Sequence, residues 1–393
     1  MIKTIKDIDI KNKKVLIRCD FNVPIKDGVI VDDNRITSSL PTIKYAIDEG
    51  SKVILFSHLG RIKEEADLKK NDLSIVASRL SELLGKEVKF VNSTRGEELE
   101  STVNSMNDGD VVLVQNTRYE DLDGKKESSN DEELGKYWAS LGDVFINDAF
   151  GTIHRAHASN VGIATYLPSG IGFLVEKELN ALKILDNPER QYIVILGGAK
   201  VSDKIGVIDN LITKADYILV GGGMAFTFLK AAGYNIGKSL LEEEKIDYCK
   251  DLLEKYKEKI ILPTSVVLSK DAMTEVDVRE ATIKDIQDNE IGVDVGESTV
   301  NLFERYLSNA KMVVWNGPLG VYEVDKFREG TIEVLKYLTD NNIRTIIGGG
   351  DTAAIVSSNK ELKDKLYHVS TGGGATLEYL EGKELPGIKA LNK

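Results

Sequence analysis

The sequence of 393 residues has few cysteines, few histidines and no long apolar run. Its two cysteines, Cys19 and Cys249, lie far apart and outside any CxxC motif, which excludes a secreted disulfide framework. No apolar run approaches the roughly 18 residues that a membrane span needs. Residues 1–7 alternate charged with apolar side chains and lack the apolar core of a signal peptide. We therefore expect a soluble, cytoplasmic protein that binds no membrane.

Basic residues are also in the minority. The chain has 51 Lys and Arg against 63 Asp and Glu, a net charge of −12. A surface of this sign repels phosphate backbones, so a general nucleic-acid or anionic-membrane binder is excluded. A hydrophobic content of 42% and a charged content of 29% are typical of a globular protein of two or three domains. Any anion that the protein binds must be held by a local cluster of cations.

What the sequence does contain is a regular alternation of short apolar runs with amphipathic stretches. Apolar strands separated by helices indicate buried parallel sheets, so we predict an α/β fold with two sheets. A charged helical stretch at 174–185, ended by Pro188, is the expected connection between two lobes. A surface helix within one domain is the alternative. The predicted strands cover residues 15–18, 52–56, 88–91, 111–114, 144–147, 192–196, 217–220, 259–262, 312–315, 345–347 and 367–370.

In the first half, the segments that follow the strands carry charge. Ligands of open parallel sheets bind at the carboxyl ends of the strands, so these segments are the place to look for a site. They contain several arginines and three of the four histidines, within residues 18–24, 57–61, 115–118 and 147–157. Because arginine binds carboxylate and phosphate bidentately, the first lobe is predicted to hold a small, multiply charged anion. His154 and His157 could instead form a zinc pair, but the sequence offers no third ligand beside them.

In the second half, the corresponding segments carry glycine. Glycine lets a backbone approach a phosphate closely, and five such strand ends predict a nucleotide site. They lie at residues 197–198, 221–223, 316–318, 348–350 and 372–374. Lys200 and Lys204 are expected at the start of a helix, where a cation opposes the helix dipole unless a phosphate is bound. Asp351 is a candidate Mg²⁺ ligand or, equally, a plain helix N-terminal carboxylate.

Two further patterns argue weakly for other functions. Residues 233–239 resemble a P-loop but have three residues between the glycines where the motif needs four. Residues 348–353 fit GxGxxA without the expected acidic residue downstream, so a nicotinamide-dependent oxidoreductase is an alternative. A nucleotide-dependent binding protein without turnover is another. No nucleophile elbow or reactive-cysteine motif is present, which favours phosphoryl transfer between two lobes that close on each other.

The ordered motifs resemble those of phosphoglycerate kinases over essentially the whole chain. They occupy residues 18–24, 58–61, 147–157, 197–204, 221–226, 315–318, 348–352 and 371–374. The resemblance implies reversible, Mg²⁺-dependent transfer of a phosphoryl group from 1,3-bisphosphoglycerate to ADP, giving 3-phosphoglycerate and ATP, in glycolysis. It also implies a monomer with two Rossmann-like lobes and a cleft between them. The implied domains are a phosphoglycerate-binding domain at 1–171, an interdomain helix at 172–187 and a nucleotide-binding domain at 188–379, with residues from about 380 to 393 folding back onto the first domain.

The resemblance also assigns site residues by position. Phosphoglycerate would be held by Asp20, Phe21, Asn22, Arg35, His58, Leu59, Gly60, Arg61, Arg118 and Arg155. The nucleotide would be held by Gly198, Lys204, Gly222, Asn316, Pro318, Glu323, Gly349, Gly350, Asp351 and Thr352, with Asp351 also on Mg²⁺. The catalytic residues would be Arg35, Lys200, Gly373 and Gly374. The two cations would neutralise the moving phosphoryl group, and the glycine amides would face it.

Three positions depart from the family pattern. Ile62 stands where proline is usual, Cys19 where valine is frequent, and Gln115 where glutamate is frequent. These departures bear on the geometry of the loops that contain them. Arg35 and Lys200, the two cations expected to act in catalysis, are both present.

Overall fold

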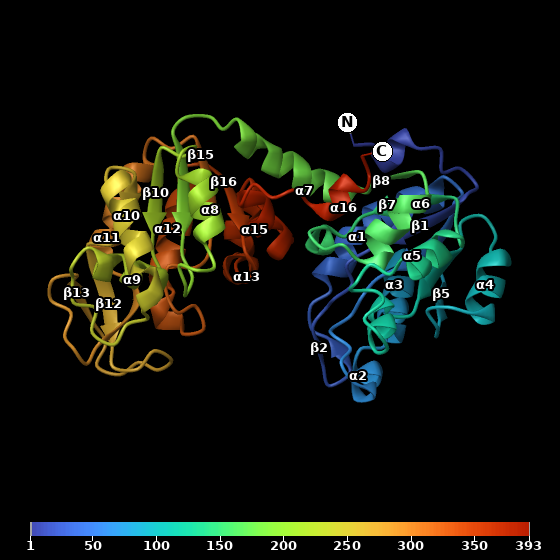
Figure 1. The fold of residues 1–393 in the computed structure, drawn as a ribbon, viewed down its shortest axis with the longest axis horizontal. Helices are drawn as coiled ribbons and strands as arrows, with labels where there is room; N and C mark the ends of the chain where they lie inside the picture. Colours follow the sequence, from blue (N-terminus) through green and yellow to red (C-terminus); the bar gives the residue numbers. More distant parts are fainter. Residues whose placement is uncertain (1, 393) are drawn as a thin grey trace. The chain divides into compact units, whose positions relative to one another are not determined.

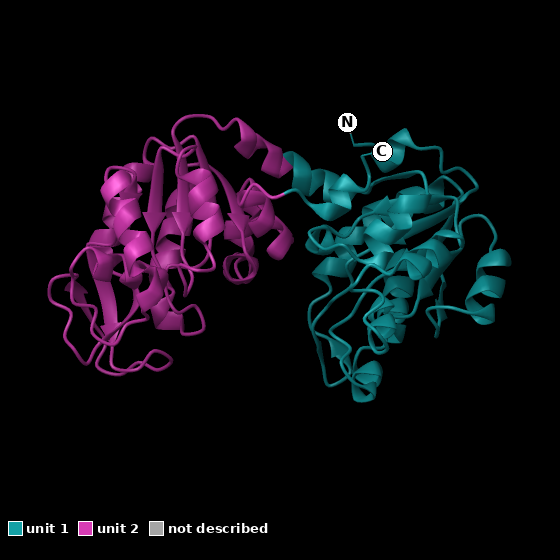
Figure 2. Cartoon of the chain, viewed as in Figure 1, with its two compact units in different colours: residues 1–180, 384–393 teal, residues 181–383 magenta. Residues whose placement is uncertain are grey.

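The computed structural model describes residues 2–392, and the chain divides into two compact units. Unit 1 comprises residues 1–180 and 384–393, and unit 2 comprises residues 181–383 (Figure 2). The division falls within helix α7 (Phe173–Lys183), which occupies the segment expected to connect the two lobes. The chain therefore passes between the units twice, and the second passage returns the last residues to unit 1.

Unit 1 is built on a six-stranded parallel sheet flanked by helices (Figure 1). Its strand order is β5 (Val88–Val91), β6 (Val111–Val114), β4 (Lys52–Phe56), β1 (Lys14–Arg18), β7 (Val144–Asn147) and β8 (Ser169–Ile171). Its helices are α1 (Asn34–Asp48), α2 (Glu65–Lys70), α3 (Ser74–Leu84), α4 (Glu97–Asn104), α5 (Glu132–Ala139), α6 (Ile163–Tyr166) and α16 (Pro386–Lys389). A short hairpin, β2 (Ile25–Lys26) and β3 (Val29–Ile30), lies outside this sheet.

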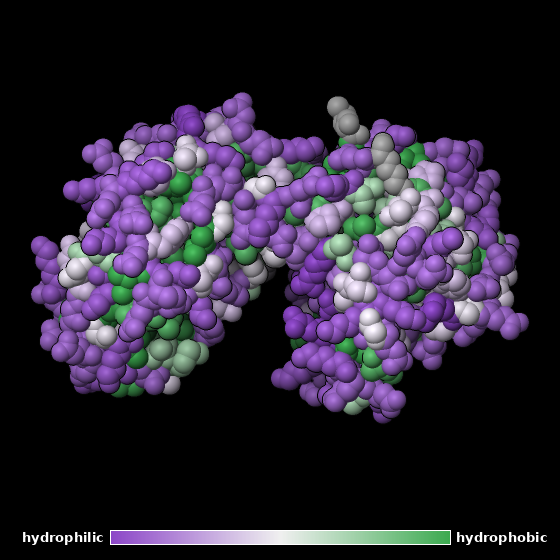
Figure 3. Space-filling model, in the orientation of Figure 1, coloured by the Kyte–Doolittle hydropathy of each residue, from purple (hydrophilic) through white to green (hydrophobic). Residues whose placement is uncertain are grey.

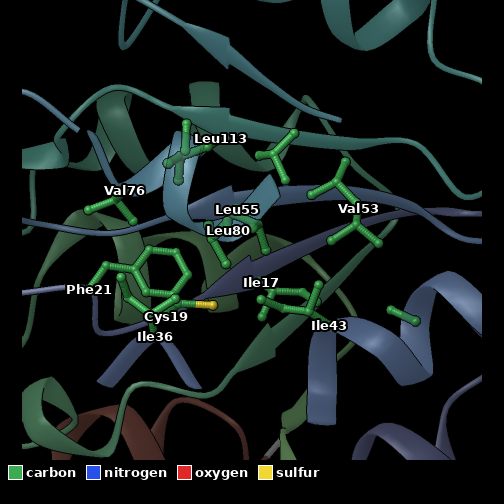
Figure 4. Close-up of a cluster of buried hydrophobic side chains, with 14 of the residues drawn as sticks. Ile17, Cys19, Phe21, Ile36, Ile43, Val53, Leu55, Val76, Leu80 and Leu113 are labelled. Atoms are coloured by element: carbon green, nitrogen blue, oxygen red, sulfur yellow. The ribbon is translucent and has the colours of Figure 1, made fainter. Parts of the chain in front are cut away.

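Alternate residues of these strands face opposite sides of the sheet, and both sides are apolar. One side packs against α1 and α3, and Figure 4 shows this cluster, with Ile17, Leu55 and Leu113 from the strands and Ile36, Ile43, Val76 and Leu80 from the helices. On β4 the next residue, Phe56, contacts Trp138 of α5 with ring centroids 5.6 Å apart. Burial on both faces explains why the strands are apolar throughout rather than alternating.

Unit 2 is also built on a parallel sheet flanked by helices. Its six parallel strands run in the order β11 (Ile260–Ile261), β10 (Tyr217–Val220), β9 (Tyr192–Leu196), β15 (Met312–Asn316), β16 (Arg344–Gly348) and β17 (His368–Val369). Its helices are α8 (Ile205–Leu211), α9 (Met224–Ala231), α10 (Ile246–Lys255), α11 (Glu297–Leu307), α12 (Glu329–Asp340), α13 (Gly350–Ser357), α14 (Lys360–Lys365) and α15 (Gly374–Leu380). The predicted α/β class with parallel sheets flanked by helices is confirmed.

A second sheet in unit 2 has no counterpart in the predicted strands. It is antiparallel and places β12 (Ser265–Ser269) between β13 (Arg279–Thr282) and β14 (Ile291–Val295). Three of the four β13 residues are exposed, and a strand with so little apolar character gives no period-2 signal. Strand β8 was missed for a related reason, since it has only three residues and contains Gly170.

Helix α7 begins in a strongly bonded corner of unit 1. The buried carboxylate of Asp148 accepts hydrogen bonds from the amides of Leu174 (2.9 Å) and Val175 (3.4 Å). The Thr42 hydroxyl accepts from the Phe173 amide at 2.9 Å. These bonds satisfy amides that a helix start leaves free. The returning C-terminal segment is also tied to unit 1, because the Gly387 amide donates to the carbonyl of Ile153 at 2.9 Å.

The surfaces are polar. In each unit the face seen in Figure 3 is largely hydrophilic, with hydrophobic residues in small separate groups. Within residues 2–392 no helix combines the length and the apolar character that crossing a bilayer requires.

Gln115, one of the departures from the family pattern, is fully buried just after β6. Its side-chain oxygen accepts from the amides of Leu73 (3.1 Å) and Asn116 (2.8 Å). Its amide nitrogen donates to Asp72 Oδ2 (2.7 Å) and Asn92 Oδ1 (2.9 Å). Both groups of this amide are thus engaged, and glutamate could supply only the acceptor half.

We expect Gln115→Glu to lower the free energy of unfolding by about 1–3 kcal/mol at pH 7, because it loses two donated bonds and sets a carboxylate beside Asp72. Urea unfolding measures the loss, which should shrink below pH 5 as a carboxyl group becomes protonated. Gln287→Glu is the control and should cost less, because its exposed amide donates a single hydrogen bond, to the Asp285 carbonyl at 3.1 Å. Equal stability of wild type and Gln115→Glu at pH 7 would contradict this account.

Candidate active site

The strand register of unit 1 brings the charged segments together. Arg18, the last residue of β1, is paired with Phe56 of β4 on one side and Asn147 of β7 on the other. The segments that follow these three strands therefore leave the sheet at one level and on one edge. Side chains from these segments, with Arg35 of α1 and Arg118 after β6, form a cluster that we call the cation pocket: Asp20, Asn22, Arg35, His58, Arg118, Arg155 and His157.

An ion pair and a hydrogen bond hold the segment after β1 in the cation pocket. Arg35, the second residue of α1, forms an ion pair with Asp20. The Asn22 side-chain oxygen accepts from the Gly60 amide at 2.8 Å, which joins the segment after β1 to the one after β4. Phe21 and Leu59 lie within these segments, but both side chains are buried in the hydrophobic core. Their backbone amides already donate to Ser57 Oγ (2.8 Å) and Asn116 Oδ1 (3.2 Å), so these residues shape the pocket from behind.

The remaining arginines differ in how firmly they are held. Arg118 is nearly buried, and its Nη1 donates to the Gly60 carbonyl at 2.6 Å, while its buried Nε has no partner. Arg155 is exposed and donates to His154 Nε2 at 3.2 Å, and Arg61 is exposed. The pKa of Arg118 is lowered by burial and then by Arg155 and Arg18. Like charges crowded in this way are relieved by a bound anion.

Three residues behind the pocket were not assigned from the sequence. Arg18 is fully buried, and its Nη2 lies 3.9 Å from Oε1 of the equally buried Glu127. Ser159 donates its hydroxyl to Glu127 and accepts from Arg18 Nε at 2.8 Å. The only signal for this group is an arginine at the end of the apolar run 15–18, because Glu127 lies in a polar loop remote in sequence.

The histidines of this region are held neutral. The pKa of His58 lies well below its usual value because the ring is buried and faces Arg18, Arg118, His157 and Arg35. Burial, Arg18, Arg118 and Arg155 lower the pKa of His157 to about 3, and burial and Arg155 lower that of His154 to about 4. At neutral pH these rings can donate or accept a hydrogen bond but add no charge.

The five glycine-containing segments of unit 2 follow strands of one sheet, as predicted. Three of them, at residues 197–198, 221–223 and 316–318, border a cleft of about 520 Å³. Five of the ten expected nucleotide residues line it: Gly198, Gly222, Pro318, Glu323 and Asp351. The expected residues outside its lining are Lys204, Asn316, Gly349, Gly350 and Thr352.

The glycine segments pack directly on one another. A Cβ at Gly197 would lie 2.1 Å from the Pro318 carbonyl oxygen, and one at Gly317 would lie 2.2 Å from the Gly197 oxygen. The Gly198 amide donates to Pro318 at 2.8 Å, and the Gly222 amide donates to Leu319 at 2.9 Å. Glycine is required here because the backbones touch and because Gly317 has a φ of +94°.

Polar side chains lie beside this packing. Lys204 Nζ donates to Asn316 Oδ1 at 2.5 Å, and the buried Nδ2 of Asn316 has no partner. Thr352 Oγ1 accepts from the Gly317 amide at 3.0 Å. Lys204 precedes α8, which begins at Ile205, and Lys200 lies in the segment before it. The expectation that both lysines start a helix is therefore wrong for Lys200, whose exposed side chain belongs to a turn-rich segment.

Asp351 lies in the first turn of α13, which Gly349 and Gly350 open. It is exposed and accepts a hydrogen bond from the Tyr322 hydroxyl at 3.1 Å. Among residues 2–392 no group of three or more His, Cys, Asp or Glu side chains could hold a metal ion. Gly373, with a φ of +49°, precedes α15, which begins at Gly374. Neither of these two glycines lines the cleft.

The opposite wall of the cleft is apolar and comes largely from elements that the sequence did not indicate. Side chains from α9 and the segment after it, from the antiparallel sheet and its β12–β13 loop, and from the segment after β15 form it: Phe226, Leu240, Met273, Ile291, Val293, Val295 and Val321. A glycine-lined edge facing an apolar wall suits a ligand with phosphates at one end and a planar ring at the other.

Comparisons with known proteins agree with this arrangement. The phosphoglycerate kinase family model matches residues 5–383. The chain is 58% identical over 393 residues to the phosphoglycerate kinase of Enterococcus faecalis, and 58% identical over 394 residues to that of Listeria innocua, with 99% of each chain covered in both cases. The chain belongs to the phosphoglycerate kinase family. Its activity is accordingly that of a phosphoglycerate kinase, a glycolytic phosphotransferase (EC 2.7.2.3).

Solved phosphoglycerate kinases have the same fold. The structure from Coxiella burnetii superposes with a TM-score of 0.89 at 39% identity, covering 100% of this chain and 99% of that one. The structure from Pyrococcus horikoshii gives 0.85 at 30% identity, covering 100% and 98%. The α/β architecture is thus that of phosphoglycerate kinases at full length. The two functions left open beside it, an oxidoreductase and a binding protein without turnover, are not needed to explain the site.

The buried His157 should make this phosphoglycerate kinase acid-sensitive. Its pKa of about 3 in the folded state lies below the unfolded value near 6.5, so the unfolded chain binds the extra proton between these limits. The free energy of unfolding should therefore fall as the pH falls from about 6.5 to about 3. We expect wild type to lose up to about 1.4 kcal/mol per pH unit more than His157→Gln between pH 6 and 5, measured by urea unfolding. Parallel pH profiles of the two proteins would contradict the assignment.

Proposed function

We propose that unit 1 is the phosphoglycerate-binding domain and unit 2 the nucleotide-binding domain, with Arg35 and Lys200 neutralising the phosphoryl group that passes from 1,3-bisphosphoglycerate to ADP. One observation carries the proposal. The strand ends of unit 1 carry cations, whereas five strand ends of unit 2 carry glycine, and three of these border a cleft of about 520 Å³. The carboxyl edge of the unit 1 sheet thus suits a small anion, and the carboxyl edge of the unit 2 sheet suits a nucleotide.

The cation pocket suits a ligand with a carboxylate at one end and a phosphate at the other. Arg118 offers a buried Nε with no partner, Arg155 offers an exposed guanidinium group, and Arg61, next to Gly60 in the chain, offers another. Each guanidinium can bind an oxyanion through two parallel hydrogen bonds. Neutral His58 adds a donor without adding charge. No general base is needed, since phosphoryl transfer proceeds by positioning and charge neutralisation.

Magnesium fits the nucleotide side through Asp351. Mg²⁺ usually takes one or two carboxylates and completes its shell with phosphate oxygens and water, so a single exposed carboxylate in the first turn of α13 matches that donor set. When bound, the ion would reduce the negative charge of the nucleotide phosphates. Lys204 would hold a phosphate of the same nucleotide, and Asn316 keeps its ammonium group in place at 2.5 Å.

Transfer requires both substrates in line and sheltered from water. Because Arg35 belongs to unit 1 and Lys200 to unit 2, we infer that the units close on the substrates during turnover. The amides at Gly373 and Gly374 would then face the moving group. We also propose that the enzyme works as a monomer in the cytoplasm.

Lys200→Ala should lower kcat by several orders of magnitude and leave both KM values within about threefold, because its contact is made mainly in the transition state. Steady-state kinetics in the direction of ATP consumption measures both constants. Lys336→Ala, an exposed lysine on α12, is the matched control and should keep full activity. A kcat within tenfold of wild type for Lys200→Ala would remove Lys200 from the mechanism.

Arg155→Ala should raise the KM for 3-phosphoglycerate by about tenfold or more and leave the ATP Kd unchanged, because it removes a cation from unit 1 alone. Kinetics gives the KM, and calorimetry gives the Kd. Arg79→Ala removes a surface arginine paired with Asp33 and Glu82, and should change neither. Equal losses for both substrates would argue against separate binding domains.

A coupled assay with 3-phosphoglycerate and MgATP tests the proposal as a whole. We expect ADP formation that requires 3-phosphoglycerate and stops when EDTA removes the Mg²⁺. ADP formation that persists without 3-phosphoglycerate, or in EDTA, would overturn the proposed roles of the cation pocket or of the metal, respectively.

A further inference from the structure

Buried residues behind the cation pocket form one connected network with His58, a member of the pocket. It consists of Arg18, Glu127, Ser159 and His58, all at most 4% exposed. Arg18 and Glu127 are both fully buried and form an ion pair at 3.9 Å between Nη2 and Oε1. Charges this deep are retained only when they are paired and hydrogen-bonded, so the network needs an explanation beyond stability.

Each nitrogen of Arg18 has a different partner. Nε donates to the Ser159 hydroxyl at 2.8 Å, and Nη1 donates to the carbonyl of Cys19 at 2.5 Å. Nη2 lies 3.3 Å from Nδ1 of His58. The Ser159 hydroxyl in turn donates to Glu127, and the Ser159 amide donates to Glu127 Oε2 at 2.9 Å. The guanidinium is therefore locked in position and orientation.

Only one placement of the protons allows a hydrogen bond between Arg18 and His58. A guanidinium has five N–H donors and no acceptor, so Nδ1 of His58 must be the acceptor. A neutral imidazole that accepts at Nδ1 carries its proton on Nε2. Any anion that His58 binds must then take its hydrogen bond from Nε2–H, whereas the other tautomer would present a lone pair.

We propose that Arg18, held by Glu127 and Ser159, is a positioning residue that fixes the Nε2–H tautomer of His58 for binding the phosphoglycerate anion. The proposal rests on the proposed function of unit 1 and extends it to residues that the site assignment leaves out. Arg18 acts through His58 and donates none of its three placed contacts to the substrate. Its removal should therefore weaken phosphoglycerate binding more than it slows phosphoryl transfer.

The tautomer can be measured directly on the substrate-free enzyme. The chain has four histidines, so long-range ¹H–¹⁵N spectra of ¹⁵N-histidine-labelled protein give few signals, and the set that disappears in His58→Gln belongs to His58. At pH 7.5 we expect the His58 Nδ1 resonance of an unprotonated, hydrogen-bonded nitrogen and the Nε2 resonance of a protonated one. A protonated Nδ1 would overturn the proposal without touching the proposed substrate site.

Two variants test the route to His58. Arg18→Lys keeps the charge but cannot serve three partners with one ammonium group, and we expect a KM for 3-phosphoglycerate about tenfold higher, kcat within threefold and an unchanged ATP Kd. Ser159→Ala, which removes only the bridging hydroxyl, should show a smaller shift of the same kind. In both, the His58 Nδ1 resonance should move from its wild-type position.

Ser51→Ala is the matched control. Ser51 is also a fully buried serine of unit 1, and it donates to the Ile10 carbonyl at 2.8 Å. Its loss should reduce stability and leave the His58 signals and the KM unchanged. The same KM rise in Ser51→Ala, or unchanged His58 signals and KM in Ser159→Ala, would overturn the positioning role. If Arg18→Lys fails to fold, Ser159→Ala and the wild-type spectrum still decide the question.

Discussion

Parallel pairing of the strands is the constraint on which the rest of the molecule depends. Because all six strands of each main sheet run in one direction, their carboxyl ends lie on one edge, and residues remote in the chain become neighbours there. In unit 1 this edge collects arginines, and in unit 2 it collects glycines. The same pairing buries both faces of each sheet, so that edge is where polar chemistry can reach solvent.

Much of the site could be predicted because its signals are local. Asp20, His58 and Arg118 follow apolar runs at once, and Gly197 and Gly222 do the same in unit 2. The network of Arg18, Glu127 and Ser159 could not be predicted, because its members are joined only by tertiary packing and Glu127 comes from a polar loop with no periodicity. The apolar wall of the cleft was not predicted, because tertiary packing assembles it from α9, the antiparallel sheet and the segment after β15.

Burial decides how the charged groups of unit 1 behave. His58 and His157 stay neutral because burial and the arginines both disfavour a further positive charge. Burial also keeps the acidic Asp148, which bonds to the start of α7, closer to its neutral form. Burial raises its pKa to about 7, despite the helix amides that bond to it. The pocket thus takes its positive charge from arginine alone, so its charge from these groups does not change near neutral pH.

The double passage of the chain between the units has a consequence for biosynthesis. Residues 384–393 complete unit 1, with Gly387 bonded to Ile153 next to the pocket, yet they follow all of unit 2 in the chain. During translation unit 2 therefore leaves the ribosome before unit 1 has received its last segment. Unit 1 is therefore completed last, although most of its residues are made first, so a nascent chain can present a complete unit 2 before unit 1 has all its residues.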